Sequence, residues 1–454
     1  MSNRLTSQQI GIERQQQKKM TRNKKTLAAI LVVFYFSLVL WACVSPHQTF
    51  DKLPPGIWRG VLYLDGELIM AVDKKDIAQV SAVPGELPFT FEVKYGNGDS
   101  LEILVYNGSE RVSLKNIRYG RDKATAKDTV YASFDGYDTY LTAIFEERLM
   151  EGYWHVNYRD GYKIKFKAFY GDDRRFRLPF VDDNADFSGR YKVSFSTGTE
   201  KEYPAIGDFV QKGNKLYGTF LTETGDYRFL EGNVSGDKAS LSCFDGAHAY
   251  LFEMKKQGDA ILGEFRSGTH HRESFEGIKD ENASLTNGFN LVKIVQPNGV
   301  RFVLPDTKGQ TVDTQNDPYK GKVKVYEIMG SWCPNCMDAT TFLTEYQKSH
   351  PEVMVTALAF ERYQDPVKAM AALKTYVDAK KIEYPVLLAG HFDKKTASTL
   401  IPQIEGIKAY PTLLLVDQND QLVKVYSGFY GPATKEHAAF IKELSATIDG
   451  INHK

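Results

Sequence analysis

Two cysteines with two residues between them, Cys333 and Cys336, are the strongest candidates for chemistry in this sequence. They follow the apolar run 322–329, and residues 338–346 then carry apolar side chains at helical spacing. Cys333 therefore stands where a strand gives way to a helix. There it would face free backbone N–H groups and the positive end of the helix dipole, which favour a thiolate. The thiolate is the form of cysteine that acts as a nucleophile or binds a metal ion.

The elements that must position this pair alternate between strands and helices from about Gly288 onward. Short apolar runs predict strands, and helical periodicity predicts helices. The expected strands are 322–329, 353–360, 385–388, 412–416 and 422–426, and the expected helices are 338–346, 366–379, 394–401 and 435–448. This alternation predicts a C-terminal α/β domain over residues 286–454.

A known family can be named on these residues. The order strand, Trp332-Cys-Pro-Asn-Cys336, helix, and then Tyr410-Pro411-Thr412 at the start of a strand resembles the thioredoxin superfamily. The lead-in Phe302-Val-Leu-Pro-Asp and the segment Lys320-Gly-Lys322 are similar to its TlpA/ResA-like, membrane-tethered branch. The match covers roughly residues 290–450. It implies a thioredoxin-like fold and a thiol–disulfide oxidoreductase that needs no cofactor.

The resemblance also implies a role for each matching residue. Cys333 would attack a substrate disulfide, and Cys336 would resolve the mixed disulfide, which leaves a Cys333–Cys336 disulfide. Trp332 would shield the pair and, together with Tyr410 and Pro411, would contact the substrate. Pro411 would follow a cis peptide bond, which X–Pro tolerates far better than other bonds, and the backbone of Tyr410 would pair with the substrate chain.

Glu327 lies six residues before Cys333, where thioredoxins carry a buried acid beneath the cysteines. Strand alternation places it on one face with Val323 and Val325, so we expect it to be at least half buried with a raised pKa. It could then accept the proton of Cys336 as the mixed disulfide resolves. The alternative is an acid at the edge of the strand, paired with a lysine.

Two positions depart from the TlpA/ResA-like pattern. Ala339 stands where many members have a glutamate, with Asp338 beside it, and the dipeptide between the cysteines is Pro334-Asn335, whereas the proline usually comes directly before the second cysteine. The dipeptide tunes redox potential, so neither the potential nor the direction of electron flow carries over from the family.

Other interpretations of the cysteine pair need residues that this domain lacks. A zinc site would need a second Cys or His pair, and a peroxiredoxin would need Thr-x-x-Cys with a nearby proline. His270 and His271 are adjacent on an expected strand and point to opposite faces, so we predict no metal site. A structural disulfide without turnover stays an alternative.

The N-terminus has the pattern of an export signal. Basic residues precede the uncharged run 27–42, which ends in Leu40-Trp-Ala-Cys43. This end resembles the lipobox of bacterial lipoproteins, which implies cleavage before Cys43 and a lipid on that residue. We therefore predict a signal peptide over 1–42, with Met20 as an alternative start, and a lipidated tether over 43–55. The alternative is an uncleaved signal anchor.

Residues between this tether and the α/β domain predict β-structure. Alternating segments separated by Gly, Asn and Asp are typical of a sandwich or barrel. Phe134-Asp-Gly is echoed by Phe244-Asp-Gly, so we predict two related all-β units, over 56–180 and 181–285. Segment 220–232 is interpreted as a hairpin with Thr-Gly-Asp in its turn, or alternatively as the lining of a ligand pocket. Cys243 is expected to be a buried small hydrophobe.

Charge balance and motifs together predict a function. Lys plus Arg and Asp plus Glu both number 57, so no bulk charge favours nucleic acid. We expect a periplasm-facing bacterial lipoprotein that reduces disulfides of other envelope proteins, with electrons from a membrane thiol-transfer donor. The alternative is an envelope ligand-binding lipoprotein whose thioredoxin-like domain senses redox state.

Overall fold

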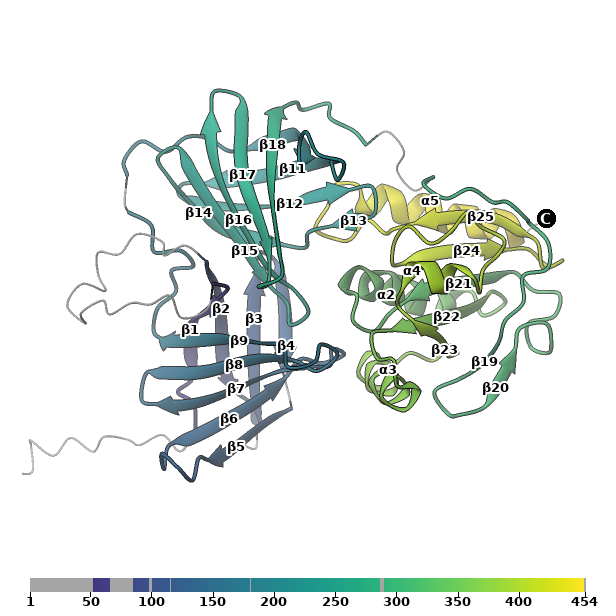
Figure 1. Ribbon diagram of the computed structural model, residues 1–454, viewed down its shortest axis with the longest axis horizontal. Helices are drawn as coiled ribbons and strands as arrows, with labels where there is room; N and C mark the ends of the chain where they lie inside the picture. The colour runs from purple at the N-terminus through teal and green to yellow at the C-terminus, as the bar shows by residue number, and fades with distance from the viewer. Residues whose placement is uncertain are drawn as a thin grey trace, which may run out of the picture. The chain divides into compact units, whose positions relative to one another are not determined.

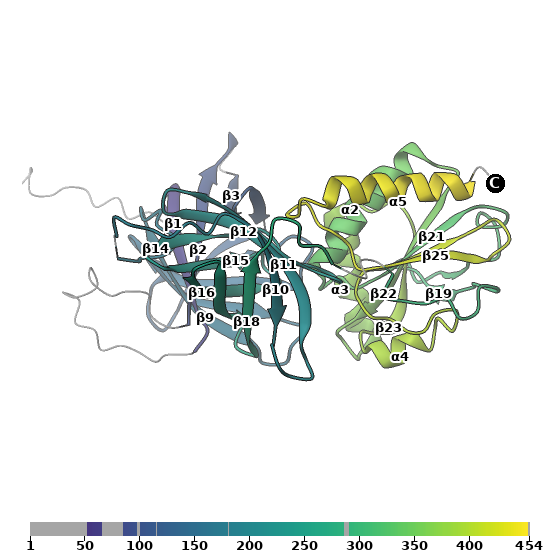
Figure 2. The same cartoon turned by 90° about the horizontal axis from the view of Figure 1, so that it is seen from above.

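The computed structural model describes residues 52–65, 85–97, 100–114, 116–179, 181–285 and 290–452 (Figures 1 and 2). The predicted signal peptide and Cys43 lie outside the described residues. Within those ranges no helix is both long and apolar enough to cross a bilayer.

The first β-sheet is an antiparallel sheet of nine strands between Gly56 and Tyr170, in the order β4-β3-β2-β1-β9-β8-β7-β6-β5. Buried and less buried side chains alternate along β7, as expected where one sheet face packs on a core. The strands are β1 Gly56–Tyr63, β2 Glu86–Tyr95, β3 Leu101–Asn107, β4 Glu110–Leu114, β5 Ile117–Arg121, β6 Asp128–Ser133, β7 Thr139–Glu146, β8 Leu149–Val156 and β9 Lys163–Tyr170.

The second sheet also has nine strands, in the order β11-β10-β18-β17-β16-β15-β14-β12-β13. Strand β11 pairs with both β10 and β12, which closes the sheet into a barrel around a phenylalanine-rich core. Its strands are β10 Gly189–Phe195, β11 Tyr203–Lys212, β12 Lys215–Thr222, β13 Gly225–Asp226, β14 Leu230–Ser235, β15 Lys238–Phe244, β16 Ala249–Gln257, β17 Ala260–Ser267 and β18 His271–Lys279. The prediction of a large β-rich region with barrel-type sheets is confirmed, and the exact unit boundaries stay a prediction.

The two echoed segments found in the sequence contact each other. The rings of Phe134 and Phe244 meet edge to face with centroids 5.3 Å apart, and the Thr139 hydroxyl donates to the carbonyl oxygen of Gly246. Buried Arg175 follows the first sheet and donates to the backbone oxygens of Tyr106, in the first sheet, and Ser242, in the barrel. These contacts join the barrel to the first sheet.

The C-terminal domain has a five-stranded mixed sheet in the order β23-β22-β21-β24-β25. Its strands are β21 Lys324–Met329, β22 Met354–Glu361, β23 Val386–His391, β24 Thr412–Val416 and β25 Leu422–Ser427, and its helices are α2 Pro334–Ser349, α3 Pro366–Lys380, α4 Lys394–Ser398 and α5 His437–Asn452. A separate hairpin pairs β19 Val303–Pro305 with β20 Thr311–Asp313. Helices α2 and α5 lie together on one side of the sheet (Figure 2), which completes the predicted thioredoxin-like α/β fold.

Helix α2 begins at Pro334, four residues before the predicted start at Asp338. Proline suits the first helical position because its missing N–H would have no partner there. Cys333 takes the N-cap position directly before it. Because the helix starts earlier than predicted, Pro334, Asn335 and Cys336 all belong to its first turn.

Candidate active site

The cysteine pair joins the end of the central strand to the first turn of α2. Cys333 has an extended backbone, and its sulfur accepts a hydrogen bond from the backbone N–H of Cys336 at 3.3 Å. The two residues form a disulfide with Cα atoms 5.2 Å apart. Cys333 is 6% exposed and Cys336 is fully buried, so the first cysteine is the one that a partner can reach. In the reduced protein the same N–H group would stabilise a Cys333 thiolate.

Three residues that the resemblance assigned to substrate binding surround Cys333. The Tyr410–Pro411 peptide bond is cis, and the carbonyl oxygen of Tyr410 lies 3.5 Å from the Cys333 sulfur. The Trp332 ring meets the Tyr410 ring edge to face at 5.4 Å, and its Nε1 donates to the carbonyl oxygen of Phe360. The structure thus brings Trp332, Tyr410 and Pro411 to the cysteine pair.

Glu327 is fully buried on the central strand β21, away from the edge of the sheet. The Thr340 hydroxyl donates to its carboxylate at 3.1 Å, and the Tyr384 hydroxyl donates at 3.4 Å. Burial raises the pKa of Glu327 to about 8, and these two hydrogen bonds oppose the shift. Because Thr340 is four residues after Cys336 on α2, the carboxylate lies beneath the first turns of that helix.

A second buried acid, Glu361, lies at the end of β22 and is not among the residues predicted from the sequence. Its carboxylate accepts hydrogen bonds from the backbone N–H of Ser331 at 2.9 Å and from the Ser331 hydroxyl at 2.7 Å. Burial raises the pKa of Glu361 to about 7. Since β21 and β22 are parallel, their carboxyl ends meet at the same edge, and this geometry could have pointed to Glu361. Glu361 thereby fixes the loop that leads into the cysteines.

The neighbouring residue, Arg362, brings a positive charge to the same edge. Its guanidinium lies 4.2 Å from the centre of the Trp332 ring and 4.6 Å from that of Phe392. Such stacking on aromatic faces is favourable for a guanidinium and holds it beside the loop. Burial lowers the pKa of Arg362, although an arginine stays charged at neutral pH.

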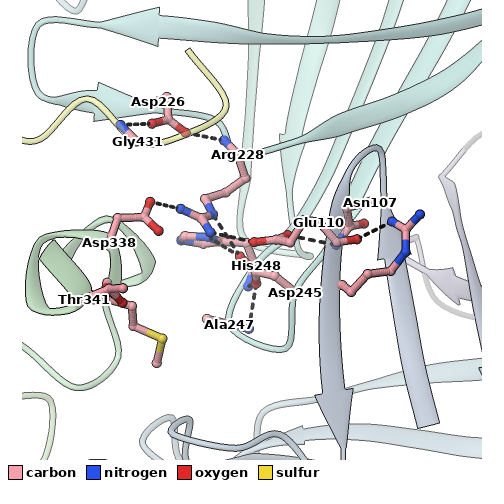
Figure 3. Close-up of polar contacts among 12 residues, drawn as sticks. Asn107, Glu110, Asp226, Arg228, Asp245, Ala247, His248, Asp338, Thr341 and Gly431 are labelled. Carbon is pink, nitrogen blue, oxygen red and sulfur yellow. Dashed lines mark hydrogen bonds and ion pairs between the residues drawn. The ribbon is translucent and has the colours of Figure 1, made fainter. Parts of the chain in front are cut away.

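The outer side of α2 contacts the barrel (Figure 3). Asp338, two residues after Cys336, forms an ion pair with Arg228 of the barrel. Arg228 is almost fully buried and also pairs with Glu110 at 2.7 Å and with Asp245 at 3.7 Å. A single guanidinium therefore holds three carboxylates, one of which belongs to the active-site helix.

Cys243 lies in the barrel core and is fully buried. Burial in apolar surroundings raises the pKa of its thiol well above the ordinary value. The residue is a free cysteine and packs as the small hydrophobe expected from the sequence.

The fold and this site define a thioredoxin-type domain that carries a redox-active disulfide. Comparison with known proteins places it more narrowly. Residues 294–439 match the Redoxin family. The chain is 22% identical over 129 residues to the thiol-disulfide oxidoreductase ResA of Halalkalibacterium halodurans, covering 28% of this chain and 66% of the relative. It is 24% identical over 145 residues to ResA of Bacillus thuringiensis, covering 32% of this chain and 75% of that one.

Solved structures similar to this chain include a thioredoxin-family thiol:disulfide interchange protein from Chlorobium tepidum and StoA from Bacillus subtilis. The first has 18% identity and a TM-score of 0.27, over 34% of this chain and 95% of its own. StoA has 19% identity and a TM-score of 0.24, over 32% and 95%. On the Redoxin match and the ResA relatives, the C-terminal domain is a TlpA/ResA-like thiol–disulfide oxidoreductase.

Proposed function

We propose that this protein is a membrane-tethered, extracytoplasmic enzyme that reduces disulfides of other envelope proteins through Cys333 and Cys336. The observation that carries the proposal is the position of the Cys333 sulfur. It lies at the N-terminus of α2 and 3.5 Å from the carbonyl oxygen of Tyr410, beside the cis-proline. A thiolate there is stabilised by the helix, and a substrate strand could pair with the Tyr410 backbone.

The reaction consists of two thiol–disulfide exchanges. The Cys333 thiolate attacks one sulfur of the substrate disulfide, and the second substrate sulfur leaves as a thiolate and takes up a proton. Cys336 then loses its proton and attacks the Cys333 sulfur, which releases the first substrate sulfur as a thiolate that also takes up a proton. The substrate gains two electrons as a dithiol, and the enzyme is left with the Cys333–Cys336 disulfide.

Glu327 is proposed as the group that takes the proton of Cys336. Its support is complete burial beneath α2 and a pKa raised to about 8, which suits a base working near neutral pH. Trp332, Tyr410 and Pro411 are proposed to contact the substrate. A membrane thiol-transfer protein is proposed to return the two electrons and regenerate the dithiol.

Membrane tethering is proposed through a lipid on Cys43. Its support is the basic segment, the uncharged run and the cysteine at its end. Export would also place the cysteine pair among disulfide-containing proteins, since disulfides persist outside the cytoplasm.

Insulin reduction by the purified full chain tests this function. In the presence of dithiothreitol, the protein should precipitate insulin chains well above the uncatalysed rate, and Cys333→Ser should lose this activity completely. Cys336→Ser should instead accumulate mixed disulfides, which can be isolated from cells and identified. A full chain whose rate equals that of Cys333→Ser would refute the enzymatic function and favour the redox-sensing alternative.

A further inference from the structure

One turn of the barrel lies directly against the cysteine motif. Residues 222–228, here called the Gly225 hairpin, connect β12 to β14 through the short strand β13. Gly225 has a φ of +147°, and a Cβ atom built on it would lie 2.0 Å from the side-chain nitrogen of Asn335. Asn335 is one of the two residues between the cysteines, so backbone of the barrel touches the motif itself.

The same hairpin covers the loop next to the cis-proline. A Cβ atom on Gly428 would lie 2.6 Å from the carbonyl oxygen of Thr224, and the backbone N–H of Gly428 donates to the carbonyl oxygen of Pro411 at 2.8 Å. Further along this loop, the backbone N–H of Gly431 donates to Asp226 at 2.9 Å (Figure 3). Two of the segments around Cys333 are therefore in contact with the barrel.

Charged groups hold the hairpin in this position. Arg228, at its end, pairs with Asp338 on α2. Two more pairs join the barrel to the segment before α5, where Lys435 binds Asp208 at 2.6 Å and Glu436 binds Arg190. These charged residues lie outside the cysteine motif. Their charges can therefore be reversed while both active-site cysteines are retained.

The result is a restricted approach to the attacking sulfur. Cys333 and Met337 are each 6% exposed, and Phe429, in the covered loop, is fully buried. The hairpin contacts Asn335 and Gly428, and the carbonyl oxygen of Tyr410 lies 3.5 Å from the Cys333 sulfur.

We propose that the Gly225 hairpin is a substrate-selecting wall of the disulfide-exchange site. It admits small disulfides and disulfides on slender, extended segments faster than disulfides on the surface of compact folded proteins. The role of the hairpin in substrate selection rests on the proposed function as a disulfide reductase. Its effect on access to Cys333 can be measured without turnover.

Alkylation of Cys333 measures access directly. The full chain would carry Cys43→Ser and Cys336→Ser, so that Cys333 is the reactive thiol, and its rates with iodoacetamide and with a polyethylene-glycol maleimide would be compared. The bulky-to-small rate ratio cancels changes in thiolate reactivity, because both reagents attack the same sulfur. In this parent the ratio should be at least about tenfold below that of a free cysteine peptide, since reaction with the bulky reagent requires local opening.

Two variants should open the wall. Asp338→Lys places a positive charge against Arg228, and the exchange Lys435→Glu with Glu436→Lys opposes Asp208 and Arg190 with like charges. Each should raise the ratio about fivefold or more, because local opening then costs less. The control is the exchange Lys374→Glu with Asp378→Lys, an exposed pair at 3.0 Å on α3, which should leave the ratio unchanged.

The second part of the test uses chains that retain both active-site cysteines. It compares their rates of reduction of insulin and of oxidised glutathione. Asp338→Lys should raise the insulin rate relative to the glutathione rate. The wall is refuted if the parent alkylation ratio equals that of the free peptide, or if neither interface variant changes it. If no chain reduces either disulfide, the proposed function fails, while the alkylation ratio still decides whether the wall exists.

Discussion

Arg228 of the barrel donates a hydrogen bond to Asp338, which follows the second active-site cysteine by two residues. The two residues are 110 positions apart in the sequence, and the guanidinium also pairs with Glu110 and Asp245. The active-site helix thus shares a buried charge cluster with the β-rich region (Figure 3).

Removing the two members of this pair should have unequal effects on stability. Arg228→Met leaves buried carboxylates without their cation, and removal of one partner of a buried pair costs about 3–5 kcal/mol. Asp338→Asn keeps the shape and removes one of several acids around the arginine, so it should cost about 1 kcal/mol. Urea unfolding at pH 7 measures both values. Equal losses would mean that Arg228 does not compensate the remaining acids.

Cys333 should be the first thiol to react in the reduced protein. Iodoacetamide at neutral pH should label it well before Cys336, because the N-terminus of α2 stabilises its thiolate and Cys336 is fully buried. Cys243 should stay unlabelled until the barrel unfolds, since it is buried and the pKa of its thiol is raised. Peptide mapping after timed quenching gives the order, and faster labelling of Cys336 would reverse the assigned roles.

Glu327→Gln should slow the second chemical step and leave the first nearly unchanged. Resolution of the mixed disulfide needs the Glu327 carboxylate as a base, and its pKa of about 8 means that the parent rate should rise with pH through this range. In the variant, resolution at pH 8 should be about a hundredfold slower or more, because the base is absent. Single-turnover kinetics separate the two steps. Identical rates in both proteins from pH 6 to 9 would leave Glu327 a structural residue.

The same variant should be more stable than the parent at high pH. Between the ordinary pKa of 4.5 and the folded value of about 8, the folded protein keeps a proton that the unfolded chain has released. Stability therefore falls as pH rises through this window, by on the order of 5 kcal/mol at most. Glutamine removes the penalty, so urea unfolding should favour the variant at pH 9 and show little difference at pH 4.5.

Cys43→Ser tests the lipid anchor. In cells the variant should stay unprocessed or should leave the membrane fraction without detergent, since a serine cannot carry the thioether-linked lipid. Fractionation and mass spectrometry of the mature N-terminus measure this. Normal processing with unchanged membrane partition would refute Cys43 as the anchor.

Residues that belong to a motif of fixed order, or that lie at a fixed offset from it, could be predicted, and residues that only strand pairing or domain contact brings to the site could not. Cys333, Cys336 and Pro411 belong to a motif with fixed order, and Glu327 was found from its offset along one strand. Glu361 reaches the site only because β22 pairs in parallel with β21.

Arg228 could not be predicted either, because only folding brings it to Asp338, 110 positions away in the sequence. In the sequence it lies in a segment interpreted as a hairpin, and β12, β13 and β14 confirm that interpretation, although Gly225 and Asp226 belong to β13 instead of the turn. Hydrophobic periodicity specifies which face of a strand is buried against its own core. It carries no information about which turn will meet another domain.

The contact between Gly225 and Asn335 has a consequence for modularity. The dipeptide between two such cysteines influences how readily the pair gives up electrons, and here part of that dipeptide lies against the backbone of the barrel. The excised C-terminal domain would expose Asn335 to water and change the dielectric surroundings of the sulfurs. The reduction potential of the Cys333–Cys336 disulfide measured on that fragment should therefore differ from the potential of the same disulfide in the full chain.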